Sequence, residues 1–163
     1  MTAITTELMY DAVNPANLPA GDVYAGYVNG AYPCHSEVAA RFPDARVFGI
    51  DVIGDAWEQA SILDYEEGNA CFNPAVLKAW VEQRESFRPH TSVIYTDRAN
   101  LPAVEAALEG LWHVLWVSTL DGTILTGQRS AGGNLIVATQ YETTGLYDVS
   151  RVLSSWVSHP APW

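Results

Sequence analysis

The stretch Val47-Phe-Gly-Ile-Asp-Val-Ile53 is a near-continuous run of apolar residues, and Val114-Leu-Trp-Val117 has the same character. Such runs are typical of parallel strands that are covered on both faces. Strand-like segments of this kind alternate with helix-like segments along the whole chain. This alternation indicates a parallel barrel or a doubly wound sheet.

Hydrophobic periodicity and turn residues predict seven strands and four helices. The strands are expected at 7–13, 22–28, 46–53, 60–66, 91–95, 112–118 and 135–141, and a short segment at Tyr147-Asp148 is a candidate eighth. The best marked helix has Asn73 as its N-cap and Pro74 as its first residue, and it is expected to run to about residue 86. The other helices are expected at 36–42, from the cap Asn100 to Gly110, and at 149–157.

The length of 163 residues is small for a complete eightfold barrel, which usually takes about 200 residues or more. The segment 54–59, between two predicted strands, is also too short for an ordinary helix. We therefore expect an α/β fold in the form of a shortened, irregular TIM-type (β/α) barrel. Residues 1–163 are expected to form it as a single domain.

The composition indicates an ordered protein and argues against several classes of partner. Hydrophobic residues make up 48% of the chain, and its net charge is −11 from 8 basic and 19 acidic residues. Because no cluster of Lys and Arg is longer than a pair, we expect no nucleic-acid partner. The N-terminus lacks the basic and apolar segments of a signal peptide, and no apolar run reaches transmembrane length, so we expect no membrane partner. The expected location is the cytoplasm until release by lysis, or a virion.

Neither a metal nor another cofactor is expected. The histidines show no zinc-ligand spacing with the two cysteines, and there is no Gly-rich dinucleotide or P-loop fingerprint. Cys34 and Cys71 both lie in predicted loops. Two cysteines can form one bridge or none, and both alternatives stay open.

The segment Ser61-Ile-Leu-Asp-Tyr-Glu-Glu-Gly68 is an apolar strand that ends in two acids spaced i and i+2. Side chains two apart on a strand leave by the same face, about 6.6 Å apart at ~3.3 Å per residue. Asp64 and Glu66 therefore point the same way, and their repulsion should raise one pKa. One protonated and one ionised carboxyl is the pair that glycoside hydrolysis needs. The simpler alternative is a strand that runs out into an acidic, solvated turn.

Functional residues of a parallel β/α barrel lie at the C-terminal ends of its strands. Acids occupy or follow several predicted strand ends: Asp11, Asp51, Asp64, Glu66 and Asp148. Aromatic and amide side chains end three other strands: Tyr95, Trp116 and the pair Gln140-Tyr141. Carboxylates and amides bind hydroxyl groups and aromatic faces stack on sugar rings, so this set predicts a sugar-binding cleft. Taken singly, Asp11 could be a turn former, Trp116 a core residue and Asp148 a helix cap.

The chain resembles the family 25 glycoside hydrolases, the lysozyme-type muramidases, and most closely their short relatives in actinobacteria and actinobacterial phages. The resemblance covers most of the chain. It rests on the order and spacing of seven motifs: Tyr10-Asp-Ala-Val13, Gly26-Tyr-Val28, Leu63-Asp-Tyr-Glu66, Ile94-Tyr-Thr96, Leu115-Trp-Val117, Ala138-Thr-Gln-Tyr141 and Tyr147-Asp-Val149. It implies an irregular β/α barrel with peptidoglycan as substrate. It also implies an active site made of Asp11, Asp64, Glu66 and Asp148.

The resemblance implies a role for each acid. Glu66 would be the general acid, and Asp64 would orient and polarise a water molecule or the N-acetyl group of the substrate. Asp11 and Asp148 would bind the sugar or the nucleophile and keep the local field negative. The aromatic strand ends would line the sugar subsites.

Two functions compete on these residues. The first is an enzyme, a muramidase-like glycosidase that cleaves a β-1,4 bond in peptidoglycan. The second is an inactive carbohydrate-binding or structural module of a phage particle or cell-wall assembly, with virion proteins as partners. The retention of two repelling acids favours the enzyme. The short chain without a separate wall-binding module favours the second hypothesis.

Overall fold

The computed structural model describes residues 4–68 and 70–158, and the strands of this part of the chain close into one barrel. The strands are β1 (Thr6–Asp11), β2 (Val23–Tyr27), β3 (Arg46–Asp51), β4 (Ile62–Asp64), β5 (Val93–Asp97), β6 (Val114–Ser118), β7 (Ile136–Thr143) and β8 (Asp148–Leu153). The helices are α1 (His35–Arg41), α2 (Pro74–Phe87), α3 (Leu101–Ala107), α4 (Ser154–Val157) and the short 3₁₀ helix η1 (Pro15–Asn17). The expected shortened, irregular TIM-type barrel is confirmed, and the first seven strands agree with the prediction to within about two residues at most ends.

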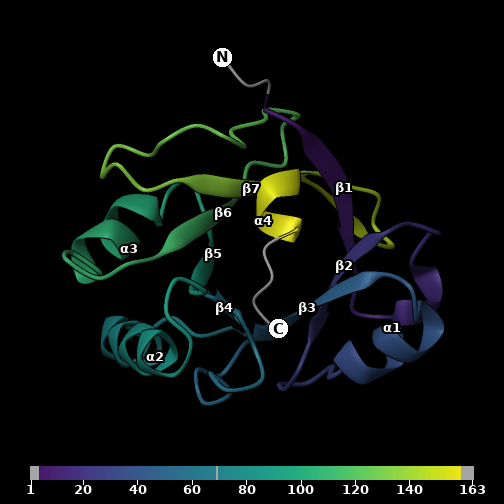
Figure 1. Ribbon diagram of the computed structural model, residues 1–163, viewed down its shortest axis with the longest axis horizontal. Coiled ribbons are helices and arrows are strands. Elements are labelled where there is room, and N and C mark those ends of the chain that lie inside the picture. The colour runs from purple at the N-terminus through teal and green to yellow at the C-terminus, as the bar shows by residue number, and fades with distance from the viewer. Residues whose placement is uncertain (1–3, 69, 159–163) are drawn as a thin grey trace.

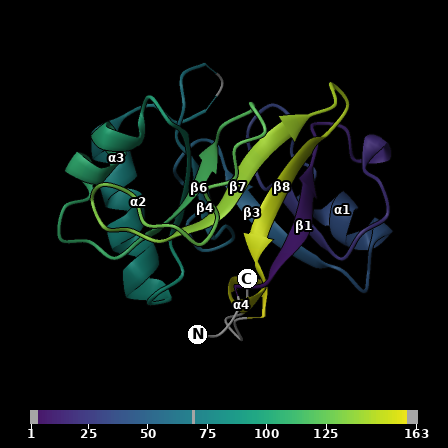
Figure 2. The same ribbon diagram turned by 90° about the horizontal axis from the view of Figure 1, so that it is seen from above.

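Strand β8 departs from the prediction, which placed a helix at 149–157. Consecutive strands from β1 to β7 pair in parallel, whereas β8 is antiparallel to both β1 and β7 (Figure 2). Only the last four predicted residues are helical, in α4. The spacing of Val152, Leu153 and Trp156 suits a helix. A strand in this place, however, pairs with β1 on one side and with β7 on the other. That pairing satisfies backbone groups that an open barrel would leave unbonded.

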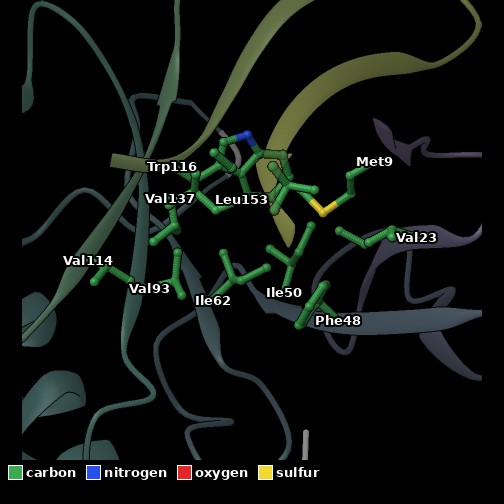
Figure 3. Packing of buried hydrophobic residues seen from close by; sticks show 13 residues of the cluster. Met9, Val23, Phe48, Ile50, Ile62, Val93, Val114, Trp116, Val137 and Leu153 are labelled. Carbon is green, nitrogen blue, oxygen red and sulfur yellow. The ribbon is translucent and has the colours of Figure 1, made fainter. Parts of the chain in front are cut away.

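The barrel interior is filled by apolar side chains that neighbouring strands contribute at matching heights. Ile50 pairs in register with Ile62, Ile62 with Val93, and Val93 with Val114. These side chains point toward one another inside the barrel, together with Phe48 (Figure 3). At the N-terminal end of the strands, α4 lies across the opening (Figures 1 and 2). The ring of Trp156 in α4 stacks on the ring of Phe48, with 4.2 Å between the ring centroids. The barrel is therefore closed at the N-terminal end of its parallel strands and open only at their C-terminal end.

Helices cover part of the outer surface. α2 and α3 pack over the outer face of β4, β5 and β6, and α1 packs on β2 and β3 (Figure 1). The α2 prediction is confirmed: Oδ1 of Asn73 accepts a hydrogen bond from the Ala75 amide, and Pro74 is the first residue. Asn100, in contrast, makes no side-chain cap hydrogen bond to α3, and α3 ends at Ala107 rather than near Gly110.

The connection from β3 to β4 contains no helix, as its length predicted. It passes so close to β3 that a Cβ at Gly49 would lie 2.8 Å from the Gln59 carbonyl oxygen. Glycine is therefore required at this position, and the connection occupies the space that a helix would fill in a complete barrel.

Both cysteines are free and buried, so the alternative without a bridge holds in this structure. In the part of the chain that the structure describes, no helix is long and apolar enough to cross a membrane.

Candidate active site

A small cavity of about 80 Å³ opens at the C-terminal end of the barrel strands. Seven of the nine residues that the sequence singled out line it: Asp11, Asp64, Glu66, Tyr95, Trp116, Gln140 and Asp148. Tyr27 and Ile50 complete the lining. Side chains from all eight strands, and Glu66 from two residues after β4, therefore line one cavity.

The acids are brought together by two local features of the barrel. Strand β4 alternates as expected, because Leu63 and Tyr65 pack outward beneath α2 while Ile62 points into the barrel. Asp64 and Glu66 follow on the side of Ile62 and line the cavity. On the opposite wall, Asp11 of β1 and Asp148 of β8 are direct partners across the antiparallel pair. Directly opposite residues of such a pair have Cβ atoms about 5 Å apart. The antiparallel β8 thus supplies the fourth acid.

Asp11 and Asp64 lie at the bottom of the cavity and are 3% and 7% exposed. Burial raises the pKa of Asp11 to about 8, with further contributions from Asp148 and Glu66. The pKa of Asp64 is also raised to about 8, again first by burial and then by Glu66 and Asp11. Among the described residues no hydrogen-bond donor reaches Oδ1 of either carboxyl. Both groups therefore hold a proton at neutral pH and keep an acceptor oxygen free.

Glu66 differs from these two acids because its side chain is only half-buried. Its pKa is raised by burial and then by the negative charges of Asp97 and Asp148. Glu66 therefore combines a pKa above the ordinary value of a glutamic acid with access from solvent.

Aromatic side chains of β2, β5 and β6 also line the cavity: Tyr27, Tyr95 and Trp116. Tyr95 and Trp116 are neighbours in register, and their rings meet edge to face at 4.8 Å. The Trp116 ring is 1% exposed and its Nε1 donates to Oγ of Ser150 at 3.0 Å. Trp116 is thus a core residue that also closes the cavity floor, and it offers no open ring face for stacking. Burial raises the pKa values of the Tyr27 and Tyr95 hydroxyls, so both remain protonated donors.

Asp51 and Tyr141 are the two residues that the structure does not bring to the cavity. Asp51 is fully buried, and its two oxygens accept five hydrogen bonds, from Asn29 Nδ2, the amides of Ile53, Gly54 and Ala56, and Trp80 Nε1. It has no oxygen left for a sugar, and it holds the β3–β4 connection and α2 together. Tyr141 lies where the register between β7 and β8 shifts, so it leaves the inward alternation that Gln140 follows.

Tyr27 lines the cavity although the sequence did not single it out as a site residue. Its position at the end of β2 is the same signal that identified Tyr95, so the strand-end rule could have found it. Asn29 and Tyr32 lie in the loop after β2 and do not end a strand, so the strand-end rule could not have identified them. Within residues 4–68 and 70–158, no group of three or more His, Cys, Asp and Glu side chains is placed to hold a metal ion.

Asp11→Asn is expected to stabilise the protein at pH 8 and to change its stability little at pH 4. The folded state keeps the Asp11 proton up to about pH 8, whereas the unfolded chain releases it near pH ~3.9. The stabilisation by this protonated carboxyl is therefore complete below about pH 4 and is lost as the pH rises through 8. The loss is up to about 1.4 kcal/mol per pH unit.

Urea unfolding of wild type and variant at both pH values measures this effect. Asp44→Asn, which changes an exposed aspartate outside the cavity, is the matched control and should show no such pH-dependent gain. An equal effect of Asp11→Asn at pH 4 and pH 8 would contradict the raised pKa.

Neither a protein-family model nor a curated protein matches the chain. Among solved structures, the muramidase from Trichobolus zukalii is similar over 93% of this chain and 94% of that chain, with 12% identity and a TM-score of 0.54. The catalytic domain of endolysin ply40 from bacteriophage P40 of Listeria monocytogenes is similar over 96% and 97%, with 12% identity and a TM-score of 0.52. The muramidase from Acremonium alcalophilum is similar over 82% and 83%, with 13% identity and a TM-score of 0.48. At these identities the likeness establishes the fold, which is the irregular barrel of lysozyme-type proteins.

Proposed function

We propose that this protein is a glycoside hydrolase of the muramidase type that cleaves a β-1,4 bond in peptidoglycan. The observation that carries the proposal is the meeting of Asp11, Asp64, Glu66 and Asp148 in one cavity at the C-terminal mouth of the barrel. Glycosidases need carboxyl groups in different protonation states, and burial together with mutual repulsion supplies them. The fold shared with the Trichobolus zukalii muramidase and with the catalytic domain of endolysin ply40 supports this reaction class. We infer that residues 1–163 act as one domain.

Glu66 is proposed as the general acid. A leaving-group oxygen can reach only a carboxyl that is partly open to solvent, and Glu66 is half-buried while Asp11 and Asp64 are at the floor. Burial and nearby negative charge raise the pKa of Glu66, which favours the protonated form that a general acid needs. The proton passes to the glycosidic oxygen as the C–O bond breaks, and Glu66 is left as a carboxylate.

Asp64 is proposed to orient the attacking group, which is either a water molecule or the N-acetyl carbonyl of the substrate itself. Its free Oδ1 is available to accept a hydrogen bond from that water molecule or from the N–H of the N-acetyl group. Asp148 is proposed to supply negative charge on the opposite wall, which stabilises the positive charge that develops on the sugar ring, and Asp11 beside it is proposed to hydrogen-bond the sugar or the nucleophile. Tyr95 and Gln140 are proposed to contact sugar hydroxyls, and Trp116 to close the floor beneath them.

The test of the proposal is the chemistry of the products from purified actinobacterial peptidoglycan. Wild type should release fragments whose new reducing ends are N-acetylmuramic acid, identified by reduction with borohydride and by muropeptide masses. Reducing ends on N-acetylglucosamine would indicate a different bond, and the absence of any release would overturn the enzymatic proposal. If the protein then still sediments with the wall, the barrel is a binding module instead.

A further inference from the structure

Beside the small cavity lies a wider groove of about 370 Å³, and the mechanism above does not use most of its lining. The loop after β2, the end of β3 and the loop after β4 form its walls. The polar and aromatic residues of its lining are Tyr27, Asn29, Tyr32, Asp64, Glu66 and Glu67. Asp64 and Glu66 also line the small cavity, so the groove is continuous with the candidate active site.

The side chains of this groove offer mainly hydrogen-bond acceptors. Nδ2 of Asn29 donates to Asp51 at 2.8 Å and to Asp55 at 3.0 Å, so both amide hydrogens of Asn29 are already used. Asn29 can therefore present only its carbonyl oxygen, which accepts from the Val52 amide. The remaining acceptors are the oxygens of Asp64, Glu66 and Glu67. Apart from protonated carboxyls, the two tyrosine hydroxyls are the only side-chain donors among the described lining residues.

The described lining of the groove has acidic side chains and no basic one. Three carboxyl groups line it, and the described lining residues include no Lys, Arg or His. A second feature points to a ligand: Asp64 is 7% exposed, and its Oδ1 has no hydrogen-bond partner among the described residues. Glu67 is exposed and is free to turn toward a bound group. A ligand that satisfies this surface must bring several donors and a positive charge.

We propose that the groove binds a protonated primary amine of the wall substrate, next to the bond that is cleaved. An ammonium group has three donors, no acceptor and a positive charge, and it is also attracted to the faces of tyrosine rings. A carboxylate would find repulsion and few donors there. The amine can come from an amino sugar that lacks its acetyl group or from the side chain of a stem peptide. This inference rests on the proposed function for the choice of substrate.

Calorimetric titration at pH 6 with two pairs of probes tests the groove without requiring any cleavage. The first pair is the β-1,4-linked tetramer of glucosamine and that of N-acetylglucosamine. The second pair is a lysine-containing stem tripeptide with its side-chain amine free or acetylated. One charge-assisted contact should make the free-amine member of at least one pair bind about tenfold tighter. The pair that shows the difference identifies the source of the amine.

Two charge-reversal variants separate the groove from the general attraction of an acidic protein for cations. Glu67→Lys should remove the tenfold preference, whereas Glu82→Lys, which makes the same change on the exposed surface of α2, should retain it. Equal affinities within both pairs would overturn the proposal. A preference that both variants reduce equally would also overturn it. Because this experiment measures binding, its result does not depend on whether the protein hydrolyses peptidoglycan.

Discussion

Glu66→Gln is expected to lower the turnover of peptidoglycan by about 1,000-fold, within the range of 10²–10⁴ that a positioned general acid contributes. Glutamine keeps the size of the side chain and its hydrogen-bonding ability, but it has no proton to give to the leaving oxygen. The half-buried position of Glu66 predicts that folding is retained. The release of new reducing ends at saturating substrate measures the rate, and binding of the wall should change little.

Glu82→Gln is the matched control for this experiment, because it makes the same chemical change on an exposed part of α2 away from the cavity. It should keep the activity of wild type. If Glu66→Gln keeps more than a tenth of the wild-type rate while Asp64→Asn loses nearly all of it, the general acid would be Asp64.

Asp51→Ala is expected to lower the free energy of unfolding by about 4 kcal/mol, which is a large part of the stability of an ordinary domain. The carboxylate accepts from Asn29 Nδ2, Trp80 Nε1 and three backbone amides of residues 53–56. Its removal leaves buried donors unpaired, and each such donor costs about 1–3 kcal/mol. Urea unfolding at pH 7, followed by tryptophan fluorescence, measures the change.

Asp55→Ala provides the comparison, since among the described residues Asp55 accepts a single, exposed hydrogen bond, from the same Asn29 side chain. Asp55→Ala should lower the free energy of unfolding by less than about 1 kcal/mol. A similar loss for both variants would show that the five hydrogen bonds of Asp51 do not hold the β3–β4 connection to α2.

The sequence was a good guide where a local pattern determines the structure. The alternation of Ile62, Leu63 and Asp64 predicted which side chains enter the barrel, and the structure confirms this alternation. The rule that functional residues end parallel strands selected seven residues that now line one cavity. The pair Asn73-Pro74 predicted the start of α2 correctly because capping depends on residues that are adjacent in the chain.

Local patterns were therefore enough to predict the fold class, the strands that carry the acids and the face from which those acids emerge. These properties follow from the two-residue repeat of a strand and from local turn and cap chemistry. Contacts between distant parts of the chain make 148–153 a strand and Asp51 a buried structural acceptor. The tertiary structure also makes the loop after β2 form a groove with the loop after β4. Each of these depends on partners far away in the chain, whose hydrogen bonds and burial outweigh the preference of the local segment.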